Sequence, residues 1–131
     1  MQINKTSDTA IALIVALARS EDTVVNSHAL SDRVGCSYHY TQQIMGKLRD
    51  QGIIGVKRGP SNSGYYLCRP VEEISLYDVI APFEKSMQID SALSGDSTLR
   101  EEPQVTEFWD ETQKIVDQKL KETSVQDLLD D

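Results

Sequence analysis

The stretch Ser37–Leu67, SYHYTQQIMGKLRDQGIIGVKRGPSNSGYYL, decides the fold of this 131-residue chain. Its first part predicts a helix that Ser37 caps and Gly52 ends, because Ser favours the N-cap and Gly the position after a helix. The runs IIGVKR and YYLCR are β-prone and surround the turn GPSNSG, so they predict a hairpin. Lys57 and Arg58 stand at the edge of that turn. A polar helix therefore leads directly into a basic hairpin.

The residues before this stretch predict two more helices. Thr6 or Ser7 can cap the first, which contains IALIVALAR and is apolar nearly all round, as expected of a buried central helix. Asn26 or Ser27 can cap the second, HALSDRV, which stops at Gly35. Two short helices joined by a Gly-containing turn form a helix-turn-helix, and the hairpin that follows makes it a winged helix.

The residues after the hairpin predict further helices. Ser75 can cap LYDVIAPFEK, which Pro82 can kink or shorten. Residues 86–103 show no period and are predicted to form a loop, and a long helix follows from Gln104 to Glu122. Its apolar residues recur at steps of three and four and form one seam: Val105, Phe108, Trp109, Ile115, Val116 and Leu120. The predicted fold is mainly α with a small β-hairpin, divided into a winged helix-turn-helix domain over 1–70 and a helical part over 71–131.

The charge is distributed unevenly along the chain. The net charge is −8. Residues 1–70 carry eight basic and five acidic side chains, whereas residues 71–131 carry five basic and sixteen acidic ones. This asymmetry indicates that only the first part meets a polyanion. No apolar run approaches the roughly 18 residues that span a membrane, and IALIVALA lacks a signal-peptide cleavage site, so we expect a cytoplasmic protein.

The helix after Ser37 presents a polar face that suits base reading. On a helical wheel at about 100° per residue, its packing face comprises Thr41, Ile44, Met45 and Leu48. The opposite face comprises His39, Gln42, Gln43, Gly46, Lys47 and Asp50. Gln can form two hydrogen bonds with adenine, and His can donate to or accept from a base edge. We therefore predict base reading by His39, Gln42 and Gln43; the alternative is an ordinary solvated helix face.

The basic turn strengthens the nucleic-acid interpretation. A cation on a thin turn can enter the narrow and strongly negative minor groove, which is the role predicted for Arg58 beside Lys57. Phosphate contacts that position the protein without reading sequence are predicted for Lys5, Ser37, Tyr40, Lys47 and Lys57.

The sequence resembles the Rrf-two family of bacterial winged-helix repressors. The resemblance is carried by TAIALIVALA, GCSYHYTQQIMGKLRDQGII, VKRGPSNSGYYLCRP, EEISLYDVI and the Trp109 helix. It implies a homodimer in which the long C-terminal helices cross, so that the apolar seam becomes a dimerisation surface. It also implies base reading by His39 and Gln42, a backbone role for Tyr40 and a minor-groove role for Arg58. The family often has an acidic residue at position 42, so Gln42 suggests a different base preference.

The cysteines depart from the family pattern. Many members hold an iron–sulfur cluster through three cysteines in the loop before the Trp-containing helix, but here SALSGDSTLREEPQ has none. We therefore predict no cluster and no other cofactor. Cys36 precedes a helix N-terminus, which favours a thiolate, and is a candidate redox switch; the favoured alternative is a small residue that packs the turn. Cys68 is expected in the core. Together with His28 and His39, these cysteines match no standard zinc spacing.

The sequence predicts a DNA-binding transcriptional regulator, most simply a repressor that acts as a homodimer on a near-palindromic operator. A small molecule or a protein can serve as its effector. The alternative is a protein-binding adaptor whose winged helix no longer binds DNA. An enzyme is not expected, because no nucleophile–base pair or phosphate-binding loop is present.

Overall fold

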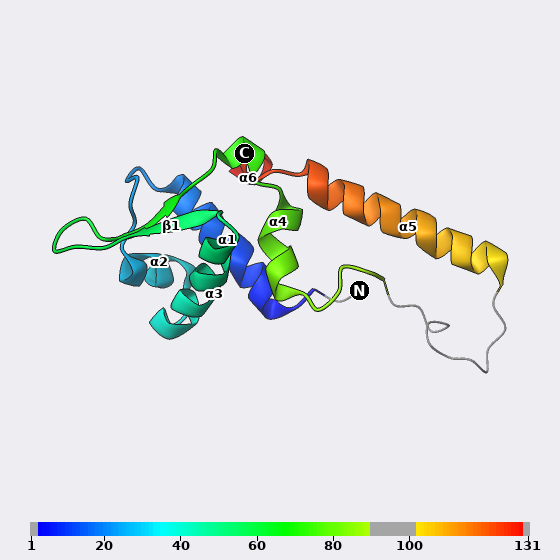
Figure 1. The fold of residues 1–131 in the computed structure, drawn as a ribbon, viewed down its shortest axis with the longest axis horizontal. Coiled ribbons are helices and arrows are strands. Elements are labelled where there is room, and N and C mark those ends of the chain that lie inside the picture. The colour runs from blue at the N-terminus through cyan, green and yellow to red at the C-terminus, as the bar shows by residue number, and fades with distance from the viewer. Residues whose placement is uncertain (1–2, 90–101, 130–131) are drawn as a thin grey trace.

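The computed structural model describes residues 3–89 and 102–129. In chain order the elements are α1 (Lys5–Arg19), α2 (Ser27–Val34), α3 (Tyr38–Asp50), β1 (Ile54–Lys57), β2 (Gly64–Leu67), α4 (Leu76–Ile80), α5 (Pro103–Glu122) and α6 (Val125–Leu129). Short 3₁₀ turns, η1 (Val71–Glu73) and η2 (Ala81–Phe83), flank α4. The hairpin and the shorter helices gather around α1, whereas α5 extends away from them (Figure 1). The predicted fold class, mainly helical with one hairpin, is confirmed.

Side-chain caps set where the first helices begin. The Asn4 side chain accepts a hydrogen bond from the Ser7 backbone N–H at 2.9 Å and caps α1. The prediction that Thr6 or Ser7 caps this helix is therefore wrong, because both residues already lie within it. Asn26 caps α2 and Ser37 caps α3, and each side chain accepts from backbone N–H groups of the first turn. These two caps agree with the sequence prediction.

The hydrophobic core is built around α1. Ala10, Leu13 and Ile14 are fully buried there. From α3 the core receives Thr41, Ile44, Met45 and Leu48, which is the predicted packing face. Later residues join the same core, among them Ile74, Val79 and Val125. Because the segment around α4 and α6 packs on α1, residues beyond position 70 help to hold the helix-turn-helix in place.

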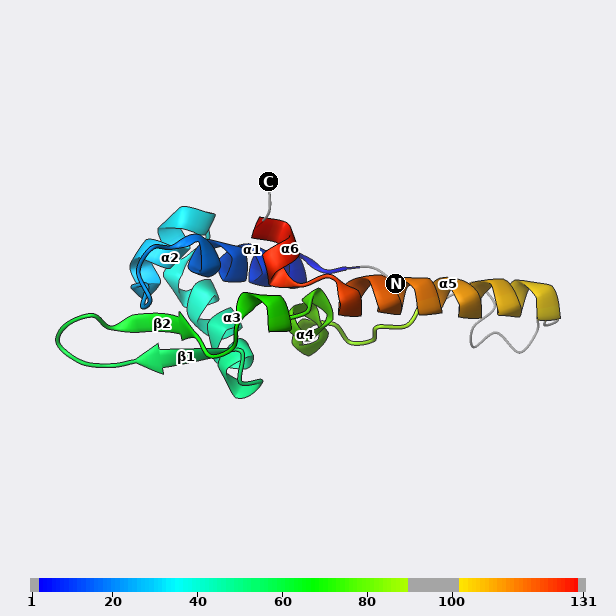
Figure 2. The ribbon, with the colours of Figure 1, turned by 90° about the horizontal axis from the view of Figure 1, so that it is seen from above.

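The hairpin is shorter than the predicted runs and is anchored to the helices. The strands pair antiparallel, with Ile54 opposite Leu67 and Lys57 opposite Gly64. Val25 adds an isolated bridge to Tyr65, with two backbone hydrogen bonds of 2.9 Å. Figure 2 shows the turn beyond β1 and β2 extending well past the helices.

The expectation that Cys68 lies in the core is wrong. The residue follows the last residue of β2 and its side chain is exposed. Its backbone N–H still donates to the Ile53 carbonyl at 3.0 Å, so only the side chain is free to face solvent. Side chains alternate between the two faces of a sheet only where the strand is paired. Cys68 lies beyond the paired residues, so its apolar neighbour Leu67 is no guide to its burial.

Two prolines shape the second part of the chain. Helix α4 ends at Ile80, and a 3₁₀ turn containing Pro82 follows, which confirms the shortening predicted from a residue without a backbone N–H. Pro103 is the first residue of α5, where a missing N–H costs no helical hydrogen bond. The start of α5 is one residue earlier than predicted, and its end at Glu122 agrees.

Helix α5 buries no residue of its own against the described part of the chain. Phe108 is 56% exposed and Ile115 is 67% exposed. Both views show the helix extending away from the core (Figures 1 and 2). At its end the backbone returns to the core, because the Leu76 N–H donates to Thr123 at 2.9 Å and the Val125 N–H to Ile74 at 2.8 Å. Among the described helices, none has the length and apolar character needed to cross a bilayer.

The close approach of the hairpin to Val25 makes Gly64 a testable constraint. Gly64 has a φ of +147°, and a Cβ atom at this position would overlap the Val25 backbone carbonyl. We expect Gly64→Ala to lower the free energy of unfolding by about 2–4 kcal/mol, measured by urea denaturation. The control is Gly46→Ala in α3, where no atom lies within 4 Å and stability should rise by about 0.5–1 kcal/mol. An unchanged midpoint for Gly64→Ala would contradict this contact.

Candidate nucleic-acid interface

The exposed surface of α3 carries two parallel rows of polar side chains. One row contains His39, Gln43 and Lys47, which are all exposed. The other row faces the hairpin and contains Tyr38, Gln42, Gly46 and Arg49. The predicted base-reading residues of α3 are thus exposed to solvent, on two adjacent rows of the helix surface.

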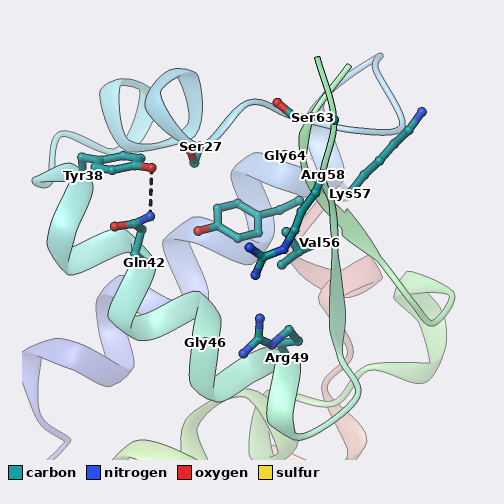
Figure 3. A pocket seen from close by; sticks show the side chains of 12 residues that line it. Ser27, Tyr38, Gln42, Gly46, Arg49, Val56, Lys57, Arg58, Ser63 and Gly64 are labelled. Atoms are coloured by element: carbon teal, nitrogen blue, oxygen red, sulfur yellow. Dashed lines mark hydrogen bonds between the residues drawn. The ribbon is translucent and has the colours of Figure 1, made fainter. Parts of the chain in front are cut away.

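A cleft of about 460 Å³ separates the second row from the hairpin. Arg49 of α3 and Arg58 beside β1 extend into this cleft from opposite walls (Figure 3). Lys57 also borders the cleft, but its side chain points away from it (Figure 3). Within residues 3–89 and 102–129, neither arginine has a carboxylate within 4 Å; the one ion pair there joins Arg69 to Asp78 at 3.7 Å. The cleft therefore offers two cations that are available to an anion.

Hydrogen bonds and stacking organise the N-terminal part of α3. The Gln42 side-chain nitrogen donates to the Tyr38 hydroxyl at 2.8 Å. The Tyr38 ring stacks on His28 of α2, with ring centroids 3.9 Å apart and planes 8° from parallel. In the first row, the side-chain nitrogen of Gln43 lies 3.2 Å from the ring nitrogen of His39. Each glutamine thus reaches back to the residue one helical turn earlier.

Tyr65 forms part of the cleft wall from the hairpin side. Its side chain is 7% exposed. Burial raises the pKa of the Tyr65 hydroxyl above its usual value of 10, the nearby Tyr38 hydroxyl adds to the rise, and Arg49 opposes it. The hydroxyl therefore stays neutral at physiological pH. In the hairpin ladder, Tyr65 lies opposite Val56 and Tyr66 lies opposite Gly55.

The predicted phosphate-binding residues lie at different places around α3. Ser37 caps the helix, and the Tyr40 hydroxyl is 2.8 Å from the Thr6 hydroxyl at the start of α1. The Lys47 ammonium lies 5.6 Å from the centre of the Phe83 ring. Tyr40 and Lys47 line a second cleft, of about 470 Å³, on the other side of α3. Lys5 is exposed at the first turn of α1.

The structure adds three residues that the sequence interpretation missed: His28, Tyr38 and Arg49. A signal for two of them was present. Arg49 follows Gln42 by seven residues and Tyr38 precedes it by four, so helical periodicity places all three on the same face. No periodicity could reveal the stack of His28 on Tyr38, because the two rings belong to different helices.

Cys36 lies in the turn before α3 and is partly buried. Its sulfur is 3.0 Å from the Thr41 hydroxyl. This contact fits the interpretation of Cys36 as a residue that packs the turn. Its role as a redox switch stays a prediction. Support would come from a loss of DNA binding on thiol oxidation in the wild type that does not occur in Cys36→Ser.

Residues 3–131 match the sequence profile of the Rrf2 family, described as iron-dependent transcriptional regulators. This chain belongs to the Rrf2 family. Among its relatives, the HTH-type transcriptional regulator IscR of Cereibacter sphaeroides is 29% identical over 125 residues, which cover 91% of this chain and 80% of the relative. The chain is thus a winged helix-turn-helix transcriptional regulator, which implies DNA binding and not enzymatic activity.

Solved structures show the same fold. CymR, the global cysteine regulator of B. subtilis, superimposes with a TM-score of 0.83 at 23% identity, covering 98% of this chain and 95% of that one. The oxidized form of Staphylococcus aureus CymR superimposes with a TM-score of 0.77 at 26% identity, covering 100% of this chain and 98% of that one. Because the agreement extends over nearly the whole length, it includes the projecting α5.

The donor set of this Rrf2 protein does not fit an iron–sulfur cluster. Such clusters are held mainly by thiolates, and the chain has two cysteines, Cys36 before α3 and Cys68 after β2. Within the described residues, no group of three or more His, Cys, Asp or Glu side chains is placed to hold a metal ion. The loop SALSGDSTLREEPQ lies largely outside those residues, so the absence of a cluster stays a prediction from sequence.

Proposed function

We propose that this Rrf2 protein is a sequence-specific repressor that binds a near-palindromic operator as a homodimer. The observation that supports this most directly is the cleft between α3 and the hairpin. One of its walls is a row of hydrogen-bonding side chains, and two arginines without carboxylate partners among the described residues extend into it. A DNA duplex presents base edges beside phosphates. The hydrogen-bonding side chains match the base edges, and the arginines match the phosphates.

The proposal assigns one groove to each element. The exposed face of α3 enters the major groove, where His39, Gln42 and Gln43 meet base edges. Arg58, on the turn of the hairpin, enters the adjacent minor groove, where narrow A·T-rich segments attract a guanidinium. Arg49 sits between the two and neutralises a phosphate at the edge of the groove.

Residues at the margins of the interface hold the backbone. The proposed set is Lys5, Ser37, Tyr40, Lys47 and Lys57. Tyr40 and Lys47 share the cleft on the far side of α3, where a phosphate would meet a hydroxyl and an ammonium together. Lys57 points away from the central cleft, which suits a contact with the backbone and not with a base (Figure 3).

The seam of α5 supports a homodimer. Val105, Phe108 and Ile115 are 40–67% exposed, which is unusual for three large apolar residues on one helix. Trp109, Val116 and Leu120 continue the seam and are partly exposed. A second copy that covers this seam would place two α3 helices in successive major grooves, about one helical turn or roughly 34 Å apart. A dimer seated there would block access of RNA polymerase, which accounts for repression.

A role on chromosomal DNA places the protein in the cytoplasm. The proposal leaves room for an effector, either a small molecule or a partner protein, that alters the relation between α5 and the helix-turn-helix. The two parts meet where the Leu76 N–H donates to the Thr123 carbonyl and the Val125 N–H donates to the Ile74 carbonyl. A change in α5 at this joint would be transmitted to α4, and through it to the core around α1.

The first test uses Arg58→Ala. The operator is obtained by sequencing genomic fragments that the purified protein retains, and competition gel shifts then compare operator with random DNA. Loss of a minor-groove contact should weaken operator binding about fivefold or more beyond any loss on random DNA. Arg19→Ala, which removes the same charge from the far end of α1, should lower both affinities equally and only slightly. Equal losses for Arg58→Ala would reject a reading role, and binding that is insensitive to salt would favour the protein-binding adaptor.

The second test concerns the dimer. Ile115→Asp places a charge in the seam and should weaken self-association at least about tenfold, as measured by sedimentation equilibrium. Lys114→Asp introduces the same side chain at the neighbouring exposed position of α5 and should leave self-association nearly unchanged. Affinity for the full operator should fall with Ile115→Asp while affinity for a half-site is retained. A dimer as tight as the wild type would contradict the assignment of this surface.

A further inference from the structure

We propose that Tyr38, braced by His28, is a positioning residue that determines which hydrogen-bonding atom Gln42 presents to a base, and so determines base preference. This inference rests on the proposed function, because it concerns how the interface discriminates between sequences. Neither Tyr38 nor His28 belongs to the predicted reading set. Tyr38 lines the cleft that contains Gln42 (Figure 3), and the His28 ring stacks on the Tyr38 ring.

The first step is the stack between the two helices of the helix-turn-helix. His28 lies in the first turn of α2, where its backbone N–H donates to the Asn26 side chain at 2.9 Å. Tyr38 is the first residue of α3, and its ring lies almost parallel to the His28 ring at 3.9 Å. Tyr38 is 38% exposed, so the surrounding core does not hold its ring in place. The stack supplies the constraint that burial does not.

The second step is the hydrogen bond to Gln42. A glutamine side chain on a helix surface has several rotamers, and rotation of its amide exchanges a donor for an acceptor. Here the amide nitrogen donates to the Tyr38 hydroxyl at 2.8 Å, and the amide oxygen lies on the other side of the amide group, directed away from Arg49 and Arg58 (Figure 3). The atom left most free for a base is therefore an acceptor.

An acceptor at this place has a defined complement. In the major groove, exocyclic amino groups are presented by adenine and by cytosine, whereas guanine and thymine present carbonyl oxygens. The anchored oxygen of Gln42 therefore favours an amino-bearing base at one position of each half-site. The Tyr38 hydroxyl accepts from Gln42 and keeps its own hydrogen, which it can donate to a neighbouring base acceptor or phosphate.

The test measures base preference and affinity separately. A randomised duplex library is selected on the full-length protein and sequenced, and the position that Gln42→Ala alters identifies the base that Gln42 reads. At that position, Tyr38→Phe keeps the ring and removes the hydroxyl, so the ratio of amino-bearing to carbonyl-bearing bases should fall about threefold or more. Affinity for random DNA should change less than about twofold, because no charge is lost.

Three further variants separate positioning from folding. Tyr40→Phe removes a hydroxyl from the same helix that does not touch Gln42, and it should leave the base ratio unchanged while it lowers affinity for all sequences. His28→Ala removes the stack and should relax the ratio, whereas His28→Phe keeps a flat ring there and should restore it. Thermal unfolding of each variant checks that a lost preference does not reflect a lost fold.

The possible outcomes distinguish a failure of the positioning role of Tyr38 from a failure of the proposed function. If the wild type selects a sequence and Tyr38→Phe selects it with the same ratio, the positioning role of Tyr38 is wrong and the proposed function stands. If the wild type binds DNA without any preference, sequence-specific repression is wrong, and the role of Tyr38 fails with it. A relaxed base ratio in Tyr38→Phe and His28→Ala, together with an unchanged base ratio in Tyr40→Phe, supports the inference.

Discussion

Four buried side chains on one face of α3 fix the direction of every polar side chain on the other face. They are Thr41, Ile44, Met45 and Leu48, each at most 1% exposed. Because a helix presents opposite faces at fixed spacing, burying this set against the core around α1 turns Gln42 and Gln43 toward solvent. Ile54 and Tyr65 of the hairpin pack in the same core, so one hydrophobic core holds both α3 and the hairpin that carries the basic turn. The placement of a polar helix beside a cationic turn is thus a consequence of apolar burial.

The charge distribution explains how an acidic chain can present a DNA-binding surface. Arg49 and Arg58 meet in one cleft, whereas carboxylates are concentrated after residue 70. Many of them lie along α5, which extends away from the helix-turn-helix (Figure 1). At physiological salt, exposed charges are largely screened beyond about 8 Å, so distant carboxylates do little to weaken a local cationic site. Net charge alone would have excluded nucleic acid, and the separation of charge along the chain and in space removes that objection.

Periodicity and capping chemistry predicted the helices, the hairpin and the exposed polar face of α3, because each depends on local spacing. Competition between neighbouring side chains was harder to predict. Asn4 caps α1 although Thr6 and Ser7 are equally suitable by type, since Ser7 is buried and its hydroxyl bonds to Glu84. Cys68 lies outside the core because the strand ladder ends one residue earlier. The position of Arg49 on the same face as Gln42 could have been predicted from the helical wheel. The bracing of Tyr38 by another helix depends on tertiary packing, which a single sequence does not reveal.

The most direct measurement is dimethyl sulfate protection on an operator fragment with the bound protein. This reagent methylates guanine N7 in the major groove and adenine N3 in the minor groove, so it reports on both grooves in one experiment. We expect protection of N7 atoms under α3 and of N3 atoms in the adjoining minor groove under Arg58, with the same pattern repeated about one helical turn away. Protection confined to a single groove, or one without the repeat, would contradict a symmetric pair of reading helices with basic turns beside them.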